Sequence, residues 1–157
     1  MMKVHEYLTT DFIYDNIEGK NKREVLEEIV KRMAKPLKLD DAKVKRVVEA
    51  LLTRESYGST GIGRGVAIPH AKIEDFNGIA VALGVVQKGV DFDAIDGADV
   101  DLLFVVISNP LKTDEYLNLL KKLAQLIHTP NFCSFLRQAK TIEDKHNTIV
   151  EFEEKVI

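Results

Sequence analysis

A histidine, an arginine and a run of glycines lie close together in the middle of the chain. His70 follows Ile68-Pro69, where the proline ring stiffens the backbone and holds Ile68 extended. Arg54 lies upstream, and four of the nine glycines fall between residues 58 and 65. An imidazole is partly unprotonated near neutral pH, so it can attack phosphorus without a separate base and form a labile N–P bond. A guanidinium makes paired contacts to phosphate oxygens. These residues suit a phosphocarrier, although a purely structural His70 is an equal alternative at this point.

The glycine-rich segment matches no nucleotide-binding motif. A dinucleotide fingerprint would need a third glycine where Val66 stands, and a strand where a helical pattern precedes the loop. A Walker A loop would need Gly-Lys-Ser/Thr, which does not follow. Two interpretations remain: backbone N–H groups that form an anion-binding nest, or a loop that is merely tight.

Other chemistry finds little support in the sequence. The acidic stretch 91–101 has Ile95 where a calcium loop needs a polar ligand, so it is interpreted as a connection between strands. His5, His128 and His146 are expected to be surface residues. The single cysteine, Cys133, excludes an intramolecular disulfide and a cysteine-rich metal site, and it is interpreted as a small buried hydrophobe.

Composition limits the class of protein. The chain has 157 residues, 45% of them hydrophobic and 30% charged, which is typical of one folded domain spanning 1–157 with its core at about 4–153. A net charge of −3 lacks the basic excess of nucleic-acid-binding proteins. The apolar runs are shorter than the roughly 20 residues of a membrane helix, and no signal peptide is recognisable at the start. We therefore expect a cytoplasmic protein without membrane insertion or nucleic-acid binding.

Hydrophobic periodicity predicts alternating helices and strands. Apolar residues at helical spacing predict helices over 21–35, 41–53, 113–128, 131–139 and 142–153. Asn21, Asp40 or Asp41, and Thr141 are candidate N-caps, and Pro36 is expected to end the first helix. Apolar, β-branched runs predict strands over 66–68, 79–87 and 102–108. The last two lack a polar face, which predicts an α/β fold: a three-layer α/β/α sandwich with a mixed, mostly parallel sheet covered by helices.

The region around His70 resembles a known family. The stretch Leu52 to His70, LTRESYGSTGIGRGVAIPH, is similar to the active-site signature of type-2 IIA domains of the bacterial phosphotransferase system, the fructose/mannitol and nitrogen-regulatory family. FDAIDG at 92–97 and VDLLF at 100–104 extend the likeness and most resemble the nitrogen-regulatory branch. The resemblance covers about Val4 to Glu153.

The resemblance implies a site and partners. His70 matches the histidine that becomes a tele-phosphohistidine, and Arg54 and Thr60 fall at phosphate-binding positions. The phosphoryl donor would be a phosphohistidine carrier protein, HPr or NPr. Because this donor already carries an activated phosphoryl group, we expect no metal and no organic cofactor. Tyr116 stands where many members have a second histidine; it is expected to line the site, and because it carries no positive charge it should stabilise the phosphoryl state less well. Arg64, where members often have a small polar residue, either compensates or faces solvent.

Three functional hypotheses follow from the resemblance. The leading one is a nitrogen-branch regulatory phosphocarrier that acts on a transporter or kinase. The second is a sugar-specific IIA component that passes phosphate to a cysteine of a IIB domain. The third is a binding-only module with weakened phosphotransfer, which Arg54 and His70 argue against and Tyr116 slightly favours.

Overall fold

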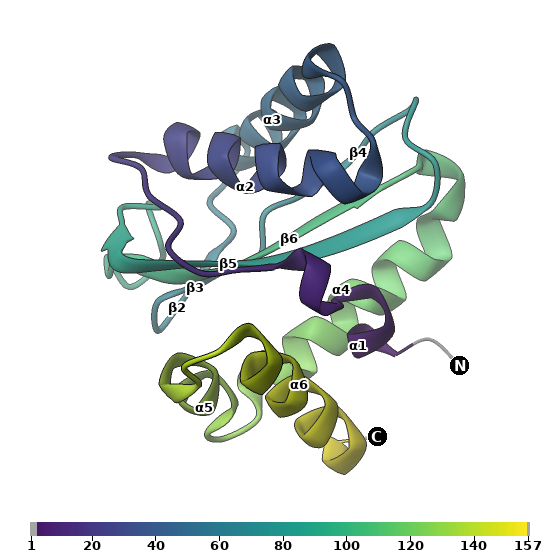
Figure 1. Cartoon of the computed structure of the whole chain (residues 1–157). Coiled ribbons are helices and arrows are strands. Elements are labelled where there is room, and N and C mark those ends of the chain that lie inside the picture. The colour runs from purple at the N-terminus through teal and green to yellow at the C-terminus, as the bar shows by residue number, and fades with distance from the viewer. Residues whose placement is uncertain (1–2, 157) are drawn as a thin grey trace.

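The computed structural model describes residues 3–156, which form a sheet with helices on both faces (Figure 1). Helices α2 (Lys22–Leu37) and α3 (Asp41–Ser56) cover one face. The other face carries the remaining helices, α1 (Val4–Tyr7), α4 (Thr113–His128), α5 (Phe132–Gln138) and α6 (Ile142–Val156). The predicted three-layer sandwich is confirmed. In residues 3–156 no helix has the length and apolar character needed to span a bilayer.

The sheet is mixed, and its two long strands lie at the centre. Its strands are β1 (Ile13–Tyr14), β2 (Gly61–Gly63), β3 (Val66–Ala67), β4 (His70–Lys72), β5 (Ile79–Val90) and β6 (Val100–Ser108). Within the described residues their order is β1-β5-β6-β3-β2, with β4 also beside β6. Pairings β1–β5, β3–β6 and β4–β6 are parallel, whereas the longest, β5–β6, is antiparallel.

Alternate residues of the central strands enter two separate cores. Leu103, Val105 and Ile107 of β6 pack with α2 and α3, whereas Leu102 and Phe104 pack with the helices of the other face. Because successive side chains of a strand point to opposite faces, a strand buried on both sides must be apolar throughout. This explains why the two longest apolar runs of the sequence form the centre of the sheet.

The predicted N-caps of α2 and α3 are present, whereas the predicted end of α2 differs. The Asn21 side chain accepts a hydrogen bond from the Glu24 N–H, and Asp40 caps α3 in the same way through Lys43. The expectation that Pro36 ends the first helix was wrong, because α2 continues to Leu37. A proline in the last turn removes only one backbone donor, and Lys38, in the left-handed conformation, closes the helix with N–H contacts to Ala34 and Lys35.

The predicted glycine loop is largely a hairpin. Strands β2 and β3 pair antiparallel, and Arg64 and Gly65 between them have φ values of 58° and 81°. Positive φ at both central residues is what a type I′ turn requires. A β-carbon on Gly65 would lie 2.7 Å from Asp101 Oδ1 and 2.9 Å from an Arg137 nitrogen, so only glycine fits there without displacement. The strand predicted over 66–68 corresponds to β3, which ends at Ala67. A separate strand, β4, begins at His70, directly after Pro69.

Candidate functional site

His70 begins β4, directly after the break in the strand at Ile68-Pro69. It pairs with Val106 of β6 in parallel register and is half-buried. The His70 Nδ1 atom lies 2.8 Å from the backbone carbonyl oxygen of Ile68. A carbonyl oxygen can only accept a hydrogen bond, so Nδ1 carries the proton in the neutral ring. The lone pair is then on Nε2, which no hydrogen bond reaches from the residues the structure describes. His70 therefore presents a nucleophilic Nε2.

The ring of Tyr116 packs beside that of His70. The two ring centroids are 6.1 Å apart and tilted by 54°. Tyr116 is 4% exposed, and this burial raises the pKa of its hydroxyl to about 12, with a smaller lowering influence from Arg54. The hydroxyl is therefore protonated near neutral pH and can donate one hydrogen bond. It contributes no positive charge.

Arg54 lies in the last turn of α3. Its Nη1 atom donates to the Gly58 carbonyl oxygen at 2.8 Å, which fixes one edge of the guanidinium. The positive charge of the guanidinium lowers the pKa of the Tyr116 hydroxyl, against the larger effect of burial. The structure thus places the His70 and Tyr116 rings side by side, and Arg54 acts on Tyr116 through its charge.

Lys72 is a further cation of this site that sequence reasoning missed. Its Nζ atom lies 5.7 Å from the centroid of the Tyr116 ring and 3.4 Å from Thr113 Oγ1. In an extended segment, residues two apart share a face, so an expected strand at 70–72 would have placed Lys72 beside His70. The break at Pro69 hid that strand from the hydrophobic pattern.

The hydrogen bonds of Thr60 attach the loop before β2 to Glu55 in this structure. It is 5% exposed, its hydroxyl donates to Glu55 Oε2, and its N–H donates to Glu55 Oε1 at 3.1 Å. Because its proton is already committed to a carboxylate, Thr60 has none to donate to a phosphoryl oxygen. Its predicted phosphate contact would require the hydroxyl to leave Glu55.

The glycine segment is held by other protein groups. The Arg64 N–H donates to Asp96 at 2.9 Å, and the Gly61 N–H to Ser59 Oγ at 3.0 Å. These contacts favour the tight-loop interpretation over an anion-binding nest. Arg64 is exposed. Val66, at the end of the same hairpin, pairs with Leu102 of β6, whereas His70 pairs with Val106, which is four residues or about 13 Å further along that strand. Arg64 therefore faces solvent away from the site.

The acidic stretch and the remaining histidines have structural roles. Asp96 accepts N–H groups from Arg64 and Ala98, which lowers its carboxyl pKa. Among residues 3–156 no cluster of three or more histidine, cysteine or acidic side chains could hold a metal. The expectation of a surface His5 was wrong. Its Nδ1 atom lies 2.6 Å from a carboxylate oxygen of buried Glu153, and the same oxygen accepts the His5 N–H. Glu153 thus holds the start of α1 against α6.

The cysteine and the two other histidines fit simpler descriptions. Cys133 is half-buried, and burial raises its thiol pKa. His128 contacts the Ala124 carbonyl oxygen at 2.7 Å near the end of α4, and His146 packs edge-on against His5. These contacts give none of the three a place beside His70.

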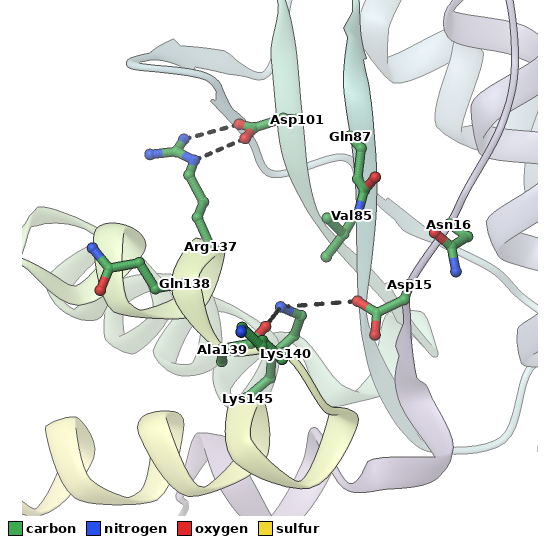
Figure 2. A pocket seen from close by; sticks show the side chains of 10 residues that line it. All are labelled: Asp15, Asn16, Val85, Gln87, Asp101, Arg137, Gln138, Ala139, Lys140 and Lys145. Carbon is green, nitrogen blue, oxygen red and sulfur yellow. Dashed lines mark hydrogen bonds and ion pairs between the residues drawn. The ribbon is translucent and has the colours of Figure 1, made fainter.

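A cavity of about 620 Å³ lies at the other end of the long strands (Figure 2). Its lining includes Val85, which pairs with Leu102, four residues along β6 from the partner of His70. Two internal ion pairs flank Val85 in Figure 2. Arg137 holds Asp101 at 2.8 and 2.9 Å, and Lys145 lies 3.9 Å from Asp15. This cavity is remote from His70, and it is not the site of its chemistry.

Comparisons with known proteins identify the family of the chain. The model of the family described as "Phosphoenolpyruvate-dependent sugar phosphotransferase system, EIIA 2" matches residues 6–151. A nitrogen regulatory protein of Pseudomonas aeruginosa is 36% identical over 151 residues, which is 96% of this chain and 97% of that protein. A fructose-specific EIIABC component of Bacillus subtilis is 40% identical over 126 residues, 80% of this chain and 20% of that one.

The structural comparison extends over nearly the whole fold. The crystal structure of nitrogen regulatory protein IIA-Ntr from Neisseria meningitidis superposes with a TM-score of 0.83 at 30% identity, covering 93% of this chain and 98% of that one. The chain belongs to the EIIA type-2 family of the phosphoenolpyruvate-dependent phosphotransferase system.

Proposed function

We propose that the protein is a phosphocarrier that accepts a phosphoryl group on Nε2 of His70 from a phosphohistidine carrier protein, HPr or NPr. The observation that carries this proposal is the hydrogen bond from Nδ1 to the Ile68 carbonyl oxygen. It assigns the proton to one nitrogen of this half-buried ring and leaves the other as a nucleophile. The family membership supports the same residue.

The transfer needs no cofactor. The Nε2 lone pair attacks phosphorus, and the bond between phosphorus and the donor's imidazole nitrogen breaks, leaving its electron pair on that nitrogen. The Nδ1 proton stays in place, and the Ile68 carbonyl oxygen stabilises the positive charge that develops on the His70 ring. Arg54 is proposed to neutralise phosphoryl oxygens, and the Tyr116 hydroxyl to donate a hydrogen bond to them.

Exposed apolar side chains that lie close in sequence to Arg54 and Tyr116 are proposed as a surface for the carrier. Tyr57 follows Arg54, Leu117 follows Tyr116, and Leu111 lies in the short helix η2 (Pro110–Lys112) before α4. Tyr57 and Leu111 are 84% and 93% exposed. Large apolar side chains on a surface are a common feature of protein–protein contacts.

A nitrogen-branch regulatory role is the form of this function that we favour. Its support is the near-complete coverage of relatives named nitrogen regulatory proteins, together with the FDAIDG segment. In this role the whole chain, 1–157, acts as one cytoplasmic domain whose phosphorylation state controls a transporter or kinase. A sugar-specific role, with transfer to a IIB cysteine, is the alternative that the fructose-specific relative represents.

Phosphorus NMR on the isolated, phosphorylated protein tests the proposed atom. The expected product is Nε2-phosphohistidine, absent from His70→Gln. A phosphoryl group on Nδ1, or on another residue, would contradict the assignment. Adding a IIB domain then separates the branches: discharge onto its cysteine supports the sugar role, whereas a stable phosphoprotein that changes affinity for a regulated partner supports the nitrogen branch.

A further inference from the structure

A buried carboxylate, Glu55, lies one residue after Arg54 in the last turn of α3. Glu55 is 6% exposed and accepts three hydrogen bonds. Two come from the N–H and hydroxyl of Thr60, and the third comes from Lys22 Nζ at 3.2 Å. A buried carboxylate is costly unless it is paired and hydrogen-bonded, and Lys22, at the start of α2, supplies the opposite charge. Glu55 therefore connects α2, the end of α3 and the loop before β2.

The hydrogen bonds continue from Glu55 to the imidazole of His70. Thr60, held by Glu55, accepts the Ile68 N–H on its own carbonyl oxygen at 3.1 Å. The Ile68 carbonyl oxygen, on the other side of the same residue, accepts the His70 Nδ1–H at 2.8 Å. A displacement of Thr60 would move the carbonyl group that selects the tautomer of His70.

The same carboxylate is connected to the turn that holds Arg54. The turn that follows α3 is closed by N–H groups of Tyr57 and Gly58, which donate to the carbonyl oxygens of Arg54 and Glu55. The Gly58 carbonyl oxygen in turn accepts Arg54 Nη1. The turn begins at the last residues of α3 and ends at Thr60. The Glu55 side chain joins these two ends, because it belongs to α3 and accepts the Thr60 N–H.

We propose that Glu55, paired with Lys22, is a positioning residue for phosphoryl transfer: it holds His70 in its Nδ1–H tautomer through Thr60 and Ile68, and it holds the turn that orients Arg54. This inference rests on the proposed role of His70. Glu55 itself touches neither the ring nor a phosphoryl group. Its contribution is the geometry of the groups that do.

Nitrogen NMR of the His70 ring tests the inference directly, at a pH where the imidazole is neutral. Wild type is expected to show a protonated Nδ1 and an unprotonated Nε2. Thr60→Val, which keeps the size of the side chain and removes the hydroxyl, should shift these signals toward a mixture of tautomers, as should Glu55→Gln and Lys22→Met. Thr60→Ser, which keeps the hydroxyl, should restore the wild-type pattern.

Phosphoryl acceptance provides the second readout. A displacement of about 1 Å at a reacting group can slow a reaction about 100-fold, so we expect Thr60→Val and Glu55→Gln to slow phosphorylation at least about tenfold. The chain offers a matched control in Arg23 and Glu49, an exposed ion pair at 2.7 Å between the same two helices. Glu49→Gln and Arg23→Met should leave both the tautomer and the rate unchanged.

The outcomes separate this inference from the proposed function. If wild type is not phosphorylated on His70, the proposed function fails, while the ring signals still test the positioning. If wild type is phosphorylated and folded Thr60→Val and Lys22→Met keep its tautomer and its rate, the positioning role is refuted. Should Glu55→Gln fail to fold, those two variants decide the question.

Discussion

Replacing Tyr116 by histidine tests how much the missing positive charge costs the phosphorylated state. A histidine at this position would be a cation when protonated, whereas burial keeps the Tyr116 hydroxyl neutral with a pKa of about 12. The substitution therefore changes the charge beside the phosphoryl group only below the pKa of the new imidazole, which is about 6.5 in an unperturbed side chain. Burial would lower that pKa and the phosphoryl group would raise it.

The size of the effect follows from the separation of the rings. At the observed 6.1 Å between the centroids of His70 and Tyr116, two unit charges interact by about 3 kcal/mol at an effective dielectric constant of about 20, and by about 0.7 kcal/mol at about 80. The phosphorylated form of Tyr116→His should therefore gain between about 3-fold and about 100-fold in its equilibrium with the carrier. The gain should be present at low pH and disappear as pH rises through the imidazole pKa.

The assay is the phosphoryl equilibrium between this chain and its carrier, measured at about pH 6 and about pH 8. Tyr116→Phe is the control, because it keeps the ring and removes only the hydroxyl; its difference from wild type should not vary between the two pH values. An equilibrium for Tyr116→His that matches wild type at both pH values would refute the electrostatic argument.

Three further substitutions follow from the geometry. Arg54→Lys should slow phosphoryl acceptance in stopped-flow kinetics about tenfold, because an ammonium cannot reproduce the paired contacts of a guanidinium; an unchanged rate would count against Arg54. Gly65→Ala should lower the free energy of unfolding in urea by about 1–3 kcal/mol. Gly78→Ala should lower it less, because both glycines have positive φ but only a β-carbon at position 65 meets other atoms; equal losses would contradict the close approach. Lys145→Met should lower the free energy of unfolding by about 1–3 kcal/mol, because it removes the buried ammonium that contacts the Leu136 carbonyl oxygen. Exposed Lys140→Met should change it little, and the reverse order would be inconsistent with the structure.

Local signals in the sequence predicted the helices well. Asn21 and Thr141 are caps whose side chains bond N–H groups three residues on, and α4 begins at Thr113 and ends at His128 as its apolar spacing indicates. Such features depend on residues a few positions apart. They are therefore available without knowledge of the fold.

Features that depend on distant pairing could not be read in this way. Strand β4 is only three residues long and exists because it pairs with β6, more than thirty positions later. Without that strand, Lys72 has no visible relation to His70. Glu55 likewise looks like one charged helix residue among many until the loop folds Thr60 over it. His70 and Arg54 could be proposed from their residue types and positions, but a purely structural His70 was then an equal alternative, and Tyr116 was proposed only because the family resemblance carries tertiary information that spacing lacks.

Intact-mass spectrometry tests the central claim most directly. The protein would be incubated with phosphoenolpyruvate, Enzyme I and either HPr or NPr, beside His70→Ala. The account predicts a gain of one phosphoryl group that is lost in acid and is absent from the variant. No gain with either carrier, or an equal gain in His70→Ala, would contradict it.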